Sequence, residues 1–168
     1  DALAAQTQVI INSIEKMLSS DTVNNSDPLG SAKQSIIDGY TAKGSSLDLG
    51  SSSDVQTILN ASPLASVPGF ENIISSLSTA IASVNTQIWS TQNTGDLFGD
   101  GRSIMLVAQD NLNSSLDELA ASPSDAVAGQ IAQAYSGANL TSLETSASDS
   151  LPTFNPATEF RIEMHVAP

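Results

Sequence analysis

One long stripe of apolar residues constrains the fold of this chain more than any other feature of its sequence. Between residues 70 and 88 the large apolar side chains recur mainly at intervals of three and four: Phe70, Ile73, Ile74, Leu77, Ile81, Val84 and Ile88. Because an α-helix makes one turn in about 3.6 residues, this spacing places them on one face over about five turns. The stripe predicts an amphipathic helix that needs apolar partners along that face.

A second stripe and several shorter ones supply these partners. Residues 105–119 place these side chains on one helical face: Met105, Ala108, Leu112, Leu116 and Leu119. Helical spacing also marks four shorter segments: residues 2–20, 27–44, 51–59 and 122–137. Only 4% of the residues are aromatic, so aliphatic side chains must fill the core, which suits closely packed helices. We therefore expect a mainly α fold, a helical bundle of about five to six helices that forms a single domain over residues 1–168.

Boundary signals accompany the helix of residues 27–44. Asp27 can cap the free amide groups at its start, and Gly44 permits the left-handed conformation that ends a helix. We expect the bulky apolar side chains of this helix to face the core: Ile36, Ile37 and Tyr40. In the preceding helix, Leu3 is expected to lie on the core-facing stripe as well.

Two later helix starts are marked by serine. Ser51 and Asp54 have the spacing of a capping box, in which each side chain accepts a hydrogen bond from the backbone N–H of the other residue. Ser122, followed by a proline at the first helical position, predicts a second N-cap. The Gly- and Ser-rich residues 44–53 are expected to form a flexible connection.

The last segment changes from helical spacing to alternation. Apolar residues alternate with polar ones, which predicts a short half-buried C-terminal β-strand with these residues on one face: Phe160, Ile162, Met164 and Val166. A lone strand leaves a row of hydrogen-bonding groups unpaired. We therefore expect residues 151–168 to be extended and to pack on the domain, with residues 104–108 as the pairing partner, or on a neighbouring molecule as an assembly element.

The composition excludes several classes of partner and site. The net charge is −13, with 18 acidic and five basic residues. Nucleic acids and anionic membranes bind basic faces, which this composition cannot build. The chain has no cysteine, so thiolate metal sites and a cysteine nucleophile are excluded. It has no run of about 18 apolar residues, so we expect no membrane span.

Several features favour an extracellular or cell-surface location. Lysine is rare, Ser, Thr and Asn are abundant, and the chain starts at Asp1 rather than at Met. Four Asn-X-Ser/Thr sequons are compatible with N-glycosylation, at Asn24, Asn60, Asn113 and Asn139. We accordingly predict a secreted or surface glycoprotein.

The segment between the two long stripes contains the candidate metal site. Residues 95–107, GDLFGDGRSIMLV, resemble the calcium loop of the FG-GAP repeats in integrin-type β-propellers. The resemblance implies Asp96 and Asp100 as Ca²⁺ ligands, because such loops place oxygen-bearing side chains at alternate positions. Phe98 stands where a third ligand would be. The alternative, which we favour, is an interhelical turn in which Asp100 caps the following helix.

The residue types used in catalysis are scarce. His165 is the only histidine, so a two-histidine mechanism or a His-cluster metal site cannot form, and we expect no enzymatic activity and no cofactor. Trp89 is expected to close the core at the end of the long helix, or alternatively to edge an apolar ligand pocket together with Phe98.

Two main functions remain open from the sequence. The first is a structural or assembly subunit that acts through contacts with copies of itself or with a surface partner. The second is a helical carrier or surface-binding protein for a hydrophobic, lipid-like ligand; in composition and helix number the chain is similar to the secreted fungal hydrophobic-surface-binding and cell-wall galactomannoprotein class. A calcium-binding module is a weaker alternative.

Overall fold

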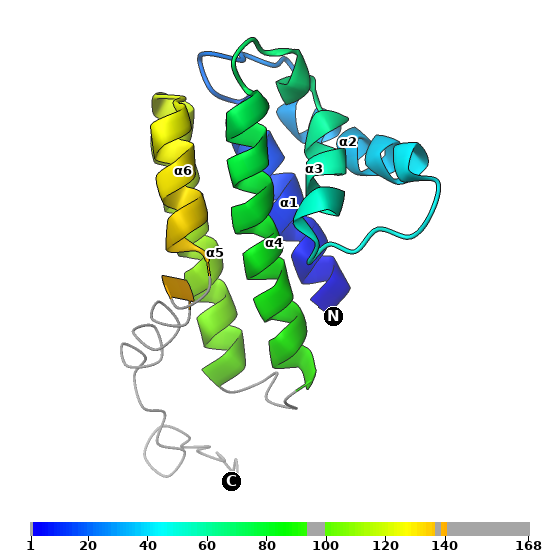
Figure 1. Cartoon of the computed structure of the whole chain (residues 1–168), viewed down its shortest axis with the longest axis vertical. Coiled ribbons are helices and arrows are strands. Elements are labelled where there is room, and N and C mark those ends of the chain that lie inside the picture. The colour runs from blue at the N-terminus through cyan, green and yellow to red at the C-terminus, as the bar shows by residue number, and fades with distance from the viewer. Residues whose placement is uncertain (1, 94–99, 137–138, 141–168) are drawn as a thin grey trace, which may run out of the picture.

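Figure 1 shows the computed structural model of the chain, which describes residues 2–93, 100–136 and 139–140. These residues form six α-helices and one short 3-10 helix, and they contain no β-strand. The mainly α helical fold expected from the sequence is confirmed. The elements are α1 (Ala2–Leu18), α2 (Pro28–Lys43), α3 (Ser52–Asn60), η1 (Pro63–Ser66), α4 (Glu71–Asn93), α5 (Asp100–Ala121) and α6 (Asp125–Ala134).

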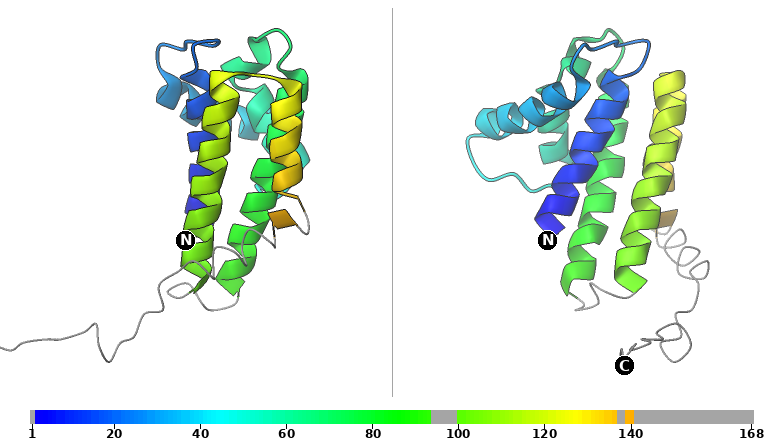
Figure 2. Two further views of the ribbon diagram at one scale, coloured as in Figure 1. Left: turned by 90° about the vertical axis from the view of Figure 1, so that its left-hand side faces the viewer. Right: turned by 180° about the vertical axis from the view of Figure 1, so that it is seen from behind.

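Helix α4 is the central element of the bundle. It packs against α1, α3, α5 and α6 (Figure 1). The two further views show α1, α4 and α5 running side by side, with α6 turning back after α5 and packing mainly on α4 (Figure 2). Helix α2 lies across the others and contacts α1 and α3. A helix surrounded in this way must be apolar over a wide face, which explains the long stripe in its sequence.

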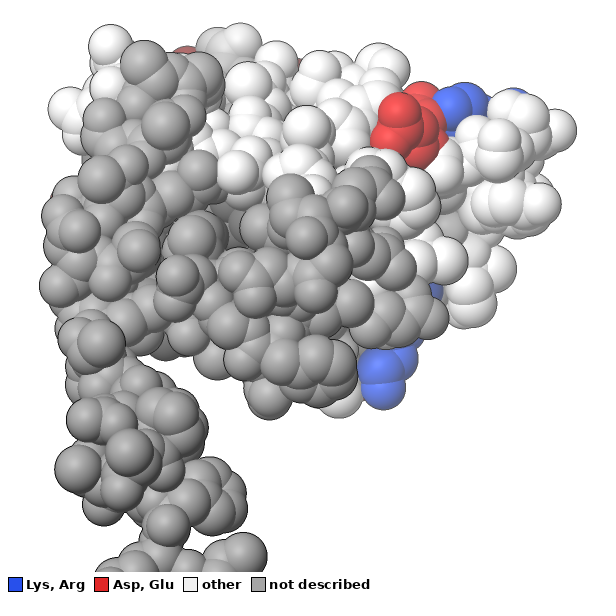
Figure 3. Space-filling view, turned by 90° about the horizontal axis from the view of Figure 1, so that it is seen from below, with Lys and Arg blue, Asp and Glu red and all other residues white. Residues whose placement is uncertain are grey.

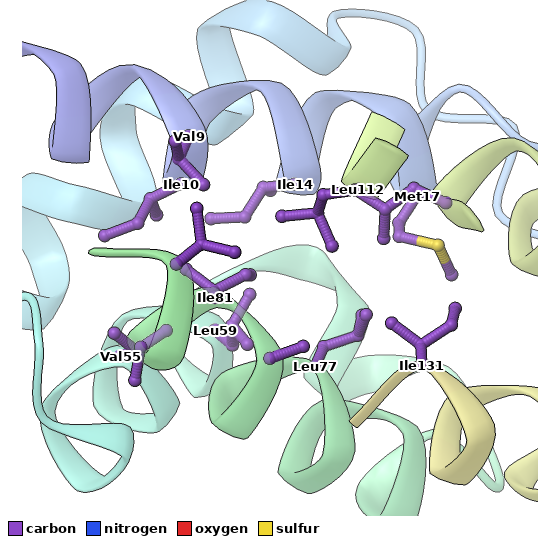
Figure 4. Close-up of a cluster of buried hydrophobic side chains, with 14 of the residues drawn as sticks. Val9, Ile10, Ile14, Met17, Val55, Leu59, Leu77, Ile81, Leu112 and Ile131 are labelled. Carbon is purple, nitrogen blue, oxygen red and sulfur yellow. The ribbon is translucent and has the colours of Figure 1, made fainter. Parts of the chain in front are cut away.

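The core is built from the aliphatic side chains of five helices. No member of the α4 stripe is more than 4% exposed, and Leu112, Leu116 and Leu119 of α5 are at most 1% exposed. Figure 4 shows side chains of α1, α3, α4, α5 and α6 pointing into one shared cluster. The α4 stripe and the described part of the α5 stripe therefore face the core as predicted, whereas the side chains of Met105 and Ala108 lie outside what the structure describes.

Helix α2 meets the bundle mainly through small residues, and of the three bulky side chains predicted to face inward only Ile36 is partly buried against the core. Its buried residues are Ala32, Ser35 and Gly39. At Gly39 a Cβ atom would lie 2.9 Å from the Cα atom of Ile58, so the backbones of α2 and α3 approach as closely as glycine allows. The predicted inward orientation of Ile37 and Tyr40 is wrong, because each is 58% exposed.

The predicted boundaries of α2 are confirmed by its capping groups. The Asp27 carboxylate accepts a 3.0 Å hydrogen bond from the backbone N–H of Gly30. Gly44 has a φ of +65° and donates its N–H to the Tyr40 carbonyl oxygen over 3.2 Å. These contacts satisfy amide and carbonyl groups that helix ends leave without intrahelical partners.

Two other capping predictions are wrong. Ser51 precedes α3, but its side chain makes no capping hydrogen bond. Helix α6 is capped by Ser124, whose hydroxyl oxygen accepts the Val127 N–H over 3.2 Å, and not by Ser122. In both places the sequence offers serines close together, and the motif alone does not determine which side chain caps the helix.

Two further predictions concern the termini. Leu3 is 57% exposed and does not lie in the core. The predicted pairing of the C-terminal strand with residues 104–108 is wrong, because these residues form part of α5. The strand residues themselves lie outside the described residues: Phe160, Ile162, Met164 and Val166.

Candidate functional site

An open groove of about 660 Å³ lies where three distant segments of the chain meet. Leu3 and Gln6 of α1 form one side, residues 47–50 of the α2–α3 loop form another, and Thr86 and Trp89 of α4 complete it. We call this the Trp89 groove. Its size falls in the range of about 300–1,000 Å³ that is typical of small-molecule sites.

Two large apolar side chains at the groove face solvent. Leu3 is 57% and Trp89 is 53% exposed. The predicted core-closing role of Trp89 is wrong, because α4 continues to Asn93 and the neighbouring Ile88, 1% exposed, occupies the core position instead. Exposed apolar side chains that gather around a concave surface mark binding sites more often than isolated ones do.

The loop wall of the groove is bonded to α4 through its main chain. The side-chain Nδ2 of Asn85 donates a 2.8 Å hydrogen bond to the Leu49 carbonyl oxygen. The Thr86 hydroxyl lies 3.2 Å from the carbonyl oxygen of Gly50. A Cβ atom at Gly50 would lie 3.0 Å from this hydroxyl, so the loop follows α4 closely. The loop is thus positioned by specific bonds, in contrast to the flexible connection expected for it.

Asp54 bonds the same loop from the side of α3. Its Oδ2 atom accepts a 2.7 Å hydrogen bond from the backbone N–H of Asp48 and a second one from Nζ of Lys43. The Lys43 hydrogen bond, followed by that from the Asp48 amide, holds the pKa of Asp54 below its usual range, although burial opposes this shift. Asp54 therefore joins the end of α2 to the loop, and the capping-box role predicted for it is not seen.

Buried amides join the floor of the groove to α1. Gln6 is 5% exposed and donates from Nε2 to the main-chain carbonyl oxygen of Asn85 over 2.8 Å. Asn85 is fully buried, and its side-chain oxygen has no hydrogen-bond partner within the described residues. Asn85 thus contacts α1 with its backbone and the loop with its side chain, so that all three walls meet at this residue.

A second hollow, of about 560 Å³, lies between α1 and α5 and has a different chemistry. The ion pair between Lys16 Nζ and Asp117 Oδ1, 2.6 Å apart, lies in its wall. Glu15, Asp21 and Asn113 also line it. Charged walls suit polar or ionic contacts, so the Trp89 groove is the better candidate for an apolar ligand.

The predicted calcium ligands are only partly covered by the structure. Asp96 and Phe98 lie outside the described residues, and Asp100 is the first residue of α5. Among the side chains that are described, no group of three or more Asp, Glu or His residues could hold a metal ion. The calcium site and the pairing of Trp89 with Phe98 therefore stay predictions.

The four predicted glycosylation sites differ in accessibility. Asn24, Asn60 and Asn139 are exposed, whereas Asn113 is half-buried in α5 at the α1–α5 hollow. Asn24 lies in the loop between α1 and α2 with a φ of +47°. Glycans attach to surface segments, so Asn24 is the best placed of the four.

No sequence pattern predicts the loop residues of the groove. Leu47, Asp48 and Leu49 lie in a Gly- and Ser-rich stretch, where two leucines separated by one residue were the only sign of a contact. Their partners on α1 and α4 are dozens of residues away, so no local pattern connects them.

Comparisons with known proteins assign no family to the chain. No protein-family model, no curated protein and no solved structure matches it. Within the described part, no helix has both the length and the apolar character needed to span a membrane.

Proposed function

We propose that the protein binds a small amphipathic, lipid-like molecule in the Trp89 groove and acts as a carrier or surface-binding protein. The observation that carries this proposal is the exposure of Trp89 and Leu3 on the rim of one groove. In a chain with a single tryptophan, leaving that residue half exposed forgoes the burial of its large apolar surface. A ligand that covers the indole would recover part of that free energy.

The lining of the groove suits an alkyl chain with a polar end. Leu3, Leu47, Leu49 and Trp89 offer apolar contact, and polar groups gather at the loop. Burial of apolar surface contributes about 25 cal/mol per Å², so about 200 Å² of newly covered area contributes about 5 kcal/mol before the cost of association. Micromolar affinity corresponds to about 8 kcal/mol, so contacts between the polar end of the ligand and the loop must add to the apolar contribution.

The chemistry of the lining supports binding and not catalysis. The one titratable side chain that lines the described groove is Asp48, and one of its oxygens already accepts the Gly50 N–H over 2.9 Å. General acid-base catalysis usually needs a second group with a different pKa. We therefore propose a non-enzymatic function, at an extracellular or cell-surface location.

Trp89 provides a direct test, because no other tryptophan contributes to the fluorescence. Titration with lauroylglycerol below its micelle concentration should shift the emission to shorter wavelength and saturate. Isothermal calorimetry should give a one-to-one stoichiometry for the wild type and no binding for Trp89→Ala. Tyr40→Ala is the matched control, because Tyr40 is a similarly exposed aromatic residue on α2, outside the groove lining. A non-saturating signal, or equal loss in both variants, would refute the proposal.

A second candidate function is protein contact, and one observation favours it. Leu29, Ile37 and Tyr40 of α2 are 40%, 58% and 58% exposed, which gives α2 an outward apolar stripe. This adds to the assembly function predicted for the C-terminal segment. If the C-terminal segment is the interface, deletion of residues 158–168 should abolish the oligomers seen by light scattering. If the α2 stripe is the interface, the double substitution Ile37→Ser and Tyr40→Ser should abolish them. A wild type that stays monomeric at high concentration would exclude both interfaces.

The calcium-binding alternative has a separate test. If Asp96 and Asp100 bind Ca²⁺, the melting temperature should rise with the ion and fall with a chelator, because a ligand that binds only the folded state stabilises it. Coinciding melts in calcium and in chelator would remove this alternative.

A further inference from the structure

The charges at the Trp89 groove indicate the head group of the ligand. We infer that the groove selects amphiphiles with a cationic head group, such as long-chain alkylammonium ions, over fatty acids with the same chain. This inference rests on the proposed function, since it concerns the ligand of the same groove. Its basis is the position of Asp48 and the pairing of the lysines.

Asp48 is an exposed carboxylate in the wall of the groove. Its Oδ1 atom accepts the Gly50 N–H over 2.9 Å, and its own backbone N–H donates to Asp54 over 2.7 Å. Both bonds fix the position of the residue at the turn of the loop. An ionised carboxylate offers about four lone-pair sites on two oxygens, so it retains capacity to accept hydrogen bonds from an ammonium group.

The lysines described by the structure do not offer a counter-charge for a fatty-acid carboxylate. Lys43, at the end of α2, bonds Asp54, and Lys16 pairs with Asp117 on the other hollow. Lys33 lies on α2 and is not part of the groove lining. Seen from below, the described surface carries a few blue and red patches among mostly white residues (Figure 3). Of the side chains that the structure describes, none that lines the groove is basic, so a carboxylate head there would face Asp48 without a described counter-charge.

The long-range field acts in the same direction. The chain has a net charge of −13, which attracts cations to the whole surface and repels anions. This general attraction is weakened by salt over a Debye length of about 8 Å at physiological ionic strength. A local contact with Asp48 is screened less. Measuring affinity at several salt concentrations therefore distinguishes this contact from the general attraction by the net charge.

The test compares three head groups on one alkyl chain: dodecylammonium, lauroylglycerol and dodecanoate. Titrations follow Trp89 emission and calorimetry at physiological salt and neutral pH, below the micelle concentration of each compound. We expect the dissociation constant to rise in that order, with about tenfold between the ammonium and the carboxylate, the range that one partly exposed charge contact gives for two ligands of opposite sign.

Two variants assign the preference to Asp48. Asp48→Asn keeps the oxygen that accepts the Gly50 N–H but removes the charge, and it should reduce the preference for the ammonium compound about threefold to fivefold. Asp38→Asn removes one charge from the exposed face of α2, outside the groove lining, and should leave the preference unchanged. Circular dichroism checks that both variants keep the fold.

The outcomes distinguish the inference from the proposed function. If none of the three compounds binds, the proposed function fails and the inference with it. If lauroylglycerol binds as tightly as dodecylammonium, or if dodecanoate binds best, only the head-group inference is overturned. An ammonium preference that is the same in Asp48→Asn and disappears with added salt also overturns it, because general attraction would then explain the result.

Discussion

The side-chain Nε2 of Gln6 in α1 donates a 2.8 Å hydrogen bond to the main-chain carbonyl oxygen of Asn85 in α4, which lies 79 residues later in the chain. Both residues are almost fully buried. Because buried polar groups are costly unless they are paired, this bond restricts how α1 can rotate or slide against α4. The same residue also positions the loop wall of the groove, since the Asn85 side chain donates a hydrogen bond to the Leu49 carbonyl oxygen.

Loss of the Gln6 side chain should therefore destabilise the protein. We expect Gln6→Ala to lower the free energy of unfolding by about 1–2 kcal/mol, measured by urea denaturation. Gln8→Ala is the control, because Gln8 bonds only Asn12 on the exposed face of the same helix, and it should change the free energy by less than about 0.5 kcal/mol. Equal effects of the two variants would contradict the role assigned to Gln6.

A methyl group at Gly39 should separate α2 from α3. A Cβ atom there would lie 2.8 Å from Cγ1 and 2.9 Å from Cα of Ile58, and a backbone atom cannot move aside as a flexible side chain can. We expect Gly39→Ala to cost about 1–3 kcal/mol in thermal or urea unfolding. Gly129→Ala in α6 meets no atom within 4 Å, so it should stabilise the helix by about 0.5–1 kcal/mol. A stabilising Gly39→Ala would show that α2 packs differently.

The bonds of Asp54 predict a specific dependence of stability on pH. Since its pKa is lowered in the folded state, chiefly by Lys43 and then by the Asp48 amide, the ionised form contributes stability above the unfolded pKa of about 3.9. This contribution is lost as the pH falls from there through the lower folded pKa. The difference in unfolding free energy between wild type and Asp54→Asn should therefore be constant from neutral pH to about pH 5 and shrink below about pH 4. A difference that does not depend on pH would contradict the lowered pKa.

Two serines separated by one proline can be distinguished by mutation. Ser124 accepts the Val127 N–H at the start of α6, so Ser124→Ala should cost about 1 kcal/mol of unfolding free energy. Ser122→Ala should cost less than about 0.5 kcal/mol, because Ser122 is exposed and does not cap α6. The opposite order in chemical denaturation would assign the cap to Ser122, as the sequence suggested.

The contrast between α4 and α2 explains how far the sequence predicts this fold. In α4 the bulky residues are also the buried ones, so their spacing identified both the helix and its inner face. In α2 the start and end were predictable from Asp27 and Gly44, but the inner face was not. Close packing against α3 requires the small residue Gly39 on the inner face of α2. A large side chain such as that of Ile37 therefore lies on the outer face, although its helical spacing suggested the inner one.

The groove was less predictable because its parts are brought together by tertiary bonds. Trp89 was one of two candidate pocket residues in the sequence, and the structure places it on a groove, although its partner Phe98 lies outside the described residues. Asp54 matched a local capping motif, yet its carboxylate bonds Lys43 and the Asp48 amide. Local motifs describe contacts within a few residues, and these partners come from other elements.

The way in which the α2–α3 loop is attached has a consequence for how its specificity could change. Asn85 and Thr86 bond carbonyl oxygens of the loop, and every residue type has such an oxygen. Substitutions at Leu47 or Asp48 would alter the surface that a ligand meets while these attachments remain in place. Under the proposed function, exchanging a few loop side chains would therefore change the ligand while the frame that holds the loop stays the same.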